Sequence, residues 1–265
     1  MDNVHKYESL EALLADCNAE IDRSWIASGW SRDDGGIPVA EAIELATHGW
    51  KDGLKHMARF TSRITERVKA SLPSQTMFWD TTGQDFDMGM AINGEPECWY
   101  DFAPKDETKF CHIGVNLFYS CGVGHDVINM RGGAICAIVD ALESIGYRCE
   151  ITCVVAATDY DQYAMSTVVK NFGDALDLDR LAFITTHPAM FRRVVATNAS
   201  KFSSFHSRGG FRCDEKHDIN KGFDIYFEQL RGYAEEFRDF NKCEAKILDL
   251  LRKQGVDIQA KMQGD

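Results

Sequence analysis

The pattern of apolar and polar positions is most regular in the middle of the chain, at residues 111–157. Residues 112–120 form a nearly continuous apolar run, which is typical of a strand buried on both faces. A helix is predicted from about residue 130 to 146, because apolar side chains recur there every three or four positions. Residues 149–157 form a second buried strand. The order strand, loop, helix, strand predicts one right-handed crossover between parallel strands.

Amphipathic spacing predicts three helices in the first part of the chain. The first covers residues 9–26, and the second covers residues 39–50, opening at Pro38 and stopping near Gly49. The third covers about residues 54–72 and carries basic side chains on the face opposite its apolar stripe. This N-terminal part is therefore expected to be helical.

From residue 76 the apolar period changes to two, which is typical of strands. Three segments, TMFWD, FDMGMAIN and ECWYDFA, are separated by turn signals, of which Asn93-Gly94 is the stronger. We expect a small antiparallel meander at residues 76–104. Seven of its large apolar side chains cannot all face water, namely Phe78, Phe86, Met88, Met90, Ile92, Trp99 and Phe102.

Strands and helices continue to alternate after the central unit. Residues 163–171 are predicted to form a third strand, followed by a helix from about Asp179 that breaks at Pro188, because proline removes a helical hydrogen bond. Residues 200–221 are polar and glycine-rich and are expected to form a long loop. A further strand at 223–229 and a helix at 241–254 close the order.

These elements predict an α/β fold with a von Willebrand A-like or Rossmann-like sheet and flanking helices. An N-terminal helical segment (1–75) precedes the α/β domain (76–265), which contains the β-meander (76–104).

Composition narrows the classes of partner. The formal net charge is -12, from 41 acidic and 29 basic side chains, and this disfavours nucleic acid because Lys and Arg supply most non-specific affinity for phosphates. The basic face of the helix at 54–72 leaves nucleic-acid association open as an alternative, although a solvated helix surface is the ordinary interpretation of such a face.

Nine cysteines are expected to be reduced cytosolic thiols, because their number is odd and the chain starts without the basic and apolar segments of a signal peptide. No apolar run approaches the length needed to span a bilayer, so we expect a soluble protein that does not enter a membrane.

The loop SCGVGHD follows the first central strand, where ligands bind in open α/β sheets. A dinucleotide fingerprint fits Gly122 and Gly124, but Val127 stands where its third glycine belongs. A nucleophile hypothesis pairs Ser120 or Cys121 with a base and an orienting acid. That base and acid are His125 and Asp126, so Cys121, His125 and Asp126 are the catalytic candidates.

The same unit resembles the metal-binding strand end of von Willebrand A domains, whose motif is Asp-x-Ser-x-Ser. Phe118 occupies the Asp position, Ser120 the first Ser and Gly122 the second. One oxygen ligand of three is left, so we expect a scaffold without the ion, used as an interaction surface. The candidate binding residues are Ser120, Gly122, Gly124 and Arg131, and convergence of Asp80, Asp159 or Asp161 on Ser120 would make a pocket there.

Two other sets could hold a metal. Asp80, Asp85 and Asp87 are candidates because hard cations prefer carboxylates, but their spacing is not that of a calcium loop. Cys213 and His217 have a ligand-like interval, and His206 lies near, although zinc needs about four ligands. His187, before Pro188, is also noted. We predict no metal and no cofactor.

Several segments together resemble an uncharacterised family of proteins from tailed bacteriophages and prophages. They are GWSRDDGGIPVAEAIELATHGWKDG, AINGEPECWYDF, MRGGAICAIVDALESIGYRCEI and LDLDRLAFITTHPAMFRR. The resemblance implies a phage-encoded protein acting in the host cytoplasm, and it implies no activity or site residue. The leading hypothesis is a non-catalytic accessory protein that binds a phage or host protein. The alternative from another class is a cysteine- or metal-dependent enzyme that uses the loop at 120–126, with Cys121 and His125 as the catalytic pair.

Overall fold

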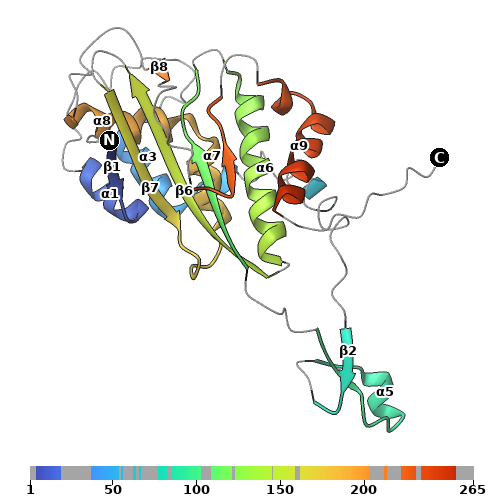
Figure 1. Cartoon of the computed structure of the whole chain (residues 1–265). Coiled ribbons are helices and arrows are strands. Elements are labelled where there is room, and N and C mark those ends of the chain that lie inside the picture. The colour runs from blue at the N-terminus through green and yellow to red at the C-terminus, as the bar shows by residue number, and fades with distance from the viewer. Residues whose placement is uncertain are drawn as a thin grey trace.

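The computed structural model describes residues 4–18, 37–53, 55, 62–63, 66, 77–82, 85–102, 109–120, 123–144, 146–158, 162–202, 212–213, 222–230 and 234–254. They form a mixed α/β structure with a large, mostly parallel sheet, helices packed against it and a separate three-stranded antiparallel sheet (Figure 1). The predicted α/β class is thereby confirmed.

The large sheet combines the middle of the chain with segments from both ends. Its strands, in spatial order, are β1 (Val4–Tyr7), β7 (Gln162–Lys170), β6 (Tyr147–Thr158), β5 (Lys109–Asn116) and β9 (Ile225–Phe227), and β8 (Arg212–Cys213) also pairs with β6. Neighbouring strands are parallel except β6 with β7, which are antiparallel, as is β6 with β8. The connection between β6 and β7 is too short for a parallel crossover, so β7 returns beside β6 in the opposite direction.

The predicted central unit is present, with α6 (His125–Ser144) between the parallel strands β5 and β6. The helix begins five residues earlier than expected, at His125 rather than residue 130. His125 and Asp126 are exposed in its first turn, and polar side chains on an exposed turn leave no apolar period to recognise. The helix is followed by Gly146, whose φ of 91° explains the glycine.

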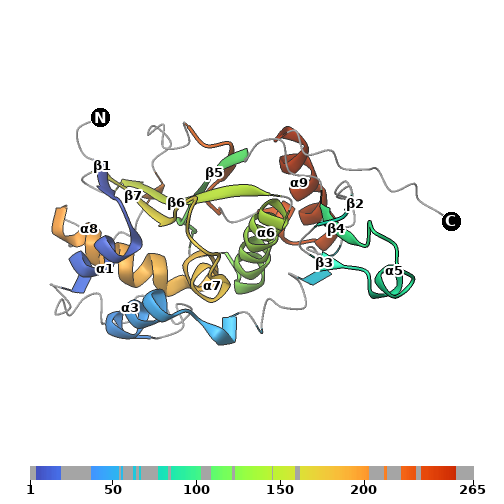
Figure 2. The same ribbon diagram turned by 90° about the horizontal axis from the view of Figure 1, so that it is seen from below.

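The helices lie mainly on one side of the large sheet, as Figure 2 shows for α1, α3, α6 and α7. Along β6, Cys149, Ile151 and Cys153 are completely buried, whereas Glu150 and Thr152 between them are only half-buried. The first half of β6 therefore buries one face fully and the other only in part, whereas the predicted buried strand at 149–157 was expected to be buried throughout.

The N-terminal segment belongs to the same hydrophobic core as the sheet. Two of its predicted helices are confirmed as α1 (Leu10–Asn18) and α3 (Val39–His48). The sequence pattern missed β1, which pairs with β7. The third predicted helix lies almost entirely outside the described residues, although residues 55, 62–63 and 66 are helical. The division at residue 75 stays a prediction.

The break at Pro188 is confirmed. α7 (Leu178–Thr186) ends before it, and the chain continues as a π-helical segment η1 (Met190–Val195) and α8 (Ala196–Phe202). A short 3-10 turn, η2 (Glu235–Phe237), precedes the last helix, α9 (Phe240–Lys253), which agrees with the predicted one and packs against α6.

The small sheet is not the predicted meander. Its strands are β2 (Met77–Asp80), β4 (Trp99–Phe102) and β3 (Asp85–Phe86), with β4 in the middle, and α5 (Met88–Ile92) replaces most of the second predicted strand. Asp87 explains the error, because its side chain accepts a hydrogen bond from the Met90 N–H (3.0 Å) and caps α5. Asn93-Gly94, with φ of 77° at Gly94, ends this helix and is not a hairpin turn.

Candidate functional site

The predicted loop begins where β5 leaves the sheet. Ser120 is half-buried, and its N–H donates to the carbonyl oxygen of Leu230 (3.0 Å), which continues the pairing of Tyr119 with Leu230. Cys121 and Gly122 lie outside the described residues. The thiol nucleophile and one candidate binding glycine therefore stay predictions.

The other loop candidates lie at the start of α6. His125 and Asp126 are exposed neighbours in its first turn, and consecutive helical side chains do not face each other, so Asp126 is poorly placed to orient the His125 imidazole. Gly124 is also exposed, and a Cβ atom built on it would meet nothing within 4 Å. Close packing within the described part of the protein therefore does not require a glycine at this position.

Arg131 lies one turn further along α6 and is only 1% exposed. Its Nη2 atom donates to the carbonyl oxygens of Asn116 (2.8 Å), Phe227 (3.1 Å) and Glu228 (3.0 Å), at the ends of β5 and β9. Nε is buried and has no hydrogen-bond partner among the described residues. Burial lowers the pKa of Arg131 to about 10, so the side chain stays charged at neutral pH. The guanidinium thus occupies the strand ends at which an open α/β sheet usually binds its ligand.

The residues aligned with the von Willebrand A motif have structural contacts. The Phe118 ring packs against Phe191, with ring centroids 5.2 Å apart, and the Phe118 N–H donates to the side-chain oxygen of Asn116 (2.9 Å). An aromatic ring in the core therefore stands where the motif has a carboxylate. Asp159 and Asp161 lie outside the described residues, and Asp80 belongs to the small sheet.

Each of the three carboxylates proposed as metal ligands accepts a hydrogen bond from a backbone N–H group one to three residues further along the chain. Asp80 accepts from the Thr81 N–H (2.6 Å), Asp85 from the Phe86 N–H (3.0 Å), and Asp87 caps α5. Among the residues that the structure describes, no group of three or more His, Cys, Asp or Glu side chains could hold a metal ion.

The histidine and cysteine candidates are only partly described. His187 is buried against Trp50 and Phe183, and its Nδ1 atom accepts from the Ala189 N–H (3.1 Å), so its contacts are those of a core residue. His206 and His217 lie outside the described residues, and Cys213 is described only as part of β8. The zinc hypothesis is untested.

A partly buried polar network that sequence reasoning missed joins β1, β7, α1 and α8. The Tyr7 hydroxyl donates to Asp16 Oδ2 (2.5 Å), Asn198 Nδ2 donates to the Tyr7 oxygen (2.6 Å) and to Asp16 Oδ2 (2.9 Å), and the Tyr163 hydroxyl donates to Asn198 Oδ1 (2.6 Å). Lys201 pairs with the other Asp16 oxygen at 2.9 Å. Asp16 on α1 thus accepts hydrogen bonds from Tyr7 of β1 and from Asn198 and Lys201 of α8. These bonds hold α1 and α8 against the sheet. Residues 191 positions apart in sequence meet here, and no local pattern shows this.

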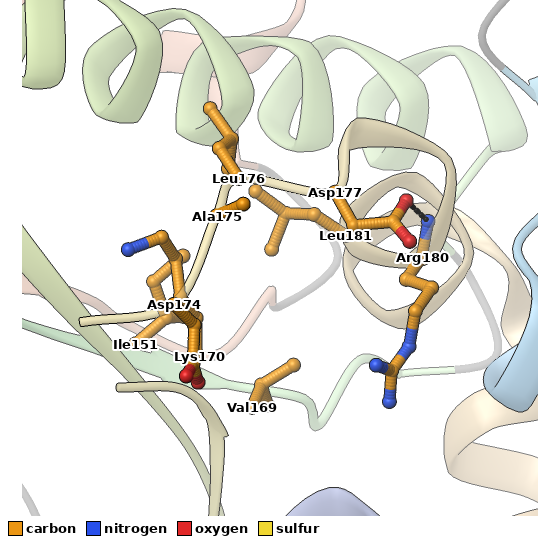
Figure 3. Close-up of a pocket in the computed structure, with 9 residues that line it drawn as sticks. All are labelled: Ile151, Val169, Lys170, Asp174, Ala175, Leu176, Asp177, Arg180 and Leu181. Carbon is orange, nitrogen blue, oxygen red and sulfur yellow. Dashed lines mark hydrogen bonds between the residues drawn. The ribbon is translucent and has the colours of Figure 1, made fainter. Parts of the chain in front are cut away.

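A pocket of about 110 Å³ lies between the C-terminal end of β7 and the start of α7. Figure 3 shows two cations and two carboxylates in its lining, namely Lys170, Arg180, Asp174 and Asp177. Ligand pockets measure roughly 300–1,000 Å³, so this one is small.

The charged groups of the pocket are bound to the protein itself. Lys170 forms an ion pair with Glu143 (2.7 Å), Arg180 reaches Glu11 (2.5 Å), and Asp177 caps α7. The charged side chains of the pocket therefore have structural roles in joining neighbouring elements.

The segment that contains the small sheet and α5 exposes large apolar side chains. Four large apolar side chains between residues 77 and 102 are solvent-exposed, contrary to the tendency of such residues to pack: Phe86 (41%), Met88 (63%), Ile92 (79%) and Trp99 (37%). Phe110 at the start of β5 is the fifth exposed large hydrophobic among the described residues. Scattered apolar residues are normal on surfaces, whereas a gathered set indicates an interaction site.

The fold and surface define an α/β protein with a mostly parallel sheet and an appended small antiparallel sheet. The chain belongs to a family described as a domain of unknown function, DUF7192, whose sequence model matches residues 2–258. Comparisons with curated proteins and with solved structures found no match. Within the residues that the structure describes, no helix has the length and apolar character needed to cross a membrane.

Proposed function

We propose that the chain is a phage-encoded accessory protein that acts in the host cytoplasm by binding another protein, and not by catalysis. The observation that carries this proposal is the exposure of Phe86, Met88, Ile92 and Trp99 on one short segment. Buried aromatic and aliphatic anchors dominate the energy of protein interfaces, so side chains of this kind left in water favour a partner that covers them. The phage origin rests on the sequence resemblance.

Two further observations favour a scaffold over an enzyme. The strand ends of β5 and β9 are filled by the Arg131 guanidinium, and the aromatic ring of Phe118 stands where the von Willebrand A motif has its carboxylate. We therefore propose that the large sheet is a von Willebrand A-like scaffold without the ion, which carries the small sheet.

The proposal is tested by affinity capture from phage-infected bacterial cells with the full chain and the double variant Met88→Ser/Ile92→Ser. Both side chains are exposed, so the variant is expected to keep its fold. The control is Phe110→Ser, which removes an exposed apolar side chain elsewhere. We expect a partner that the wild-type chain and the control retain and the double variant loses. Recovery of no specific protein by the wild-type chain would refute the proposal.

A further inference from the structure

Residues 77–102, called here the 77–102 module, present their apolar side chains in two pairs. Met88 and Ile92 are four residues apart on α5 and so lie on one face of the helix. Phe86 on β3 and Trp99 on β4 are directly opposite each other, with ring centroids 5.1 Å apart. The module therefore offers an aliphatic pair and an aromatic pair as anchors.

The charge of the module has one sign. Its 26 positions contain six carboxylates and no Lys, Arg or His, so it carries half of the formal charge of -12. Asp85, Glu95 and Glu97 are exposed. Local desolvation and the nearby carboxylates of Asp85 and Asp87 raise the pKa of Tyr100, as expected in a negative field. Apolar anchors on a segment that carries only negative charge favour a partner of opposite charge.

This field disfavours three other occupants. Nucleic acid and anionic membrane surfaces carry negative charge, and like charges placed opposite each other cost several kcal/mol. A second copy docking through the same module would bring six further carboxylates against the first six. A protein surface rich in Lys and Arg satisfies both the charge and the apolar anchors.

We infer that the 77–102 module is the docking surface for a basic protein segment whose apolar side chains cover Met88, Ile92, Phe86 and Trp99. This inference rests on the proposed function, since it names the partner class for the same surface. The carboxylates of the module set the rate and specificity of association, and the apolar side chains supply most of the affinity.

The test uses the full chain and three labelled synthetic peptides: an amphipathic helix of Lys and Leu, the same peptide with Lys replaced by Glu, and the same peptide with Leu replaced by Ser. Binding is measured by fluorescence anisotropy at low salt and at about 0.5 M salt, where surface charges are strongly screened. The variants are Glu95→Lys/Glu97→Lys and Met88→Ser/Ile92→Ser. The controls are Glu8→Lys/Glu228→Lys, which change the net charge equally at other exposed positions, and Phe110→Ser.

We expect the Lys and Leu peptide to bind, and each module variant to lose about tenfold in affinity while both controls keep it. High salt should weaken the wild-type complex. Equal binding of the Glu peptide, equal loss in the controls, or binding explained by self-association in sedimentation would overturn the inference. If the capture experiment yields a partner but the peptides do not bind, the basic partner class is wrong and the proposed function stands.

Discussion

Arg131 is the clearest case of a residue whose role depends on its surroundings. In the sequence it is a cation near the start of the predicted central helix and one of the candidate binding residues. In the structure its guanidinium bonds to the main-chain carbonyl groups of Asn116 at the end of β5, Phe227 at the end of β9 and Glu228 just after β9, and it is closed off from solvent. It joins the end of the sheet to α6.

Replacing Arg131 with Met is expected to lower the free energy of unfolding by about 3 kcal/mol, because two buried carbonyl groups and one partly buried carbonyl group lose their donor. Urea unfolding followed by circular dichroism measures the change. Arg148→Met, at an exposed position on β6, is the control and should change stability by less than about 0.5 kcal/mol. Equal midpoints for the two variants would show that the bonds of Arg131 do not hold the sheet.

The Asp16 carboxylate predicts a dependence of stability on pH. Burial alone would raise its pKa, but hydrogen bonds from Tyr7 and Lys201 outweigh burial and hold the pKa below the usual 3.8. A carboxyl group with a lowered folded-state pKa stabilises the fold above its unfolded pKa, and this contribution is lost as the pH falls through the folded-state value.

Asp16→Asn should therefore cost about 1 kcal/mol at neutral pH, because the carboxylate is partly exposed, and progressively less as the pH falls below the usual 3.8. Urea midpoints measured across this range would show the wild-type and variant curves converging in acid. Glu8→Gln, which changes an exposed carboxylate, is the control and should leave the wild-type profile unchanged. A constant difference between the Asp16→Asn and wild-type curves at all pH values would contradict the assignment.

At the scale of elements, the packing of α6 on α7 depends on Gly132. A Cβ atom at this position would lie 1.8 Å from Thr186 Cγ2, so the two helices approach more closely than an alanine allows. The sequence shows small residues on α6, but only the structure identifies which of them faces the partner helix.

Gly132→Ala is expected to destabilise the protein by about 1–3 kcal/mol through overpacking, measured as a shift in the urea midpoint. Thr186→Ser removes the clashing methyl group, so the double variant should recover part of the loss. Gly124→Ala, where a Cβ atom meets nothing within 4 Å, is the control and should be nearly neutral. Additive effects of the two substitutions would exclude a clash between them.

Local patterns located the long elements well and the short ones poorly. The strands β5, β6 and β7 and the helices α3, α7 and α9 were found because each buries a regular apolar stripe. β1 was missed because four residues carry too little pattern. For α5 the apparent period of two predicted a strand, but the Asp87 cap and the Gly94 end stabilise a short helix there.

At the scale of the molecule, β1 joins the start of the chain to the large sheet. It pairs with β7, and Tyr7 on β1 bonds to Asp16 and Asn198. Without β1, β7 becomes an edge strand with unpaired backbone groups, and such edges promote self-association.

Removing residues 1–8 is expected to lower the Tm by about 5 °C or more and to increase association, because strand pairing and the Tyr7 bonds are lost. Differential scanning calorimetry and light scattering measure the two effects. Lys6→Ala, whose side chain is exposed, should change neither. An unchanged Tm in the truncated chain would mean that β1 adds little to the fold.

The sequence by itself determined the α/β class, the central strand, helix, strand unit and the acidic character of residues 77–102, because apolar periodicity and charge are local properties. Tertiary structure alone decided the strand order, the antiparallel pairing of β6 with β7 and the burial of Arg131. It also decided which apolar side chains stay exposed at Met88, Ile92, Phe86 and Trp99. These depend on contacts between segments far apart in the chain, which no local pattern encodes.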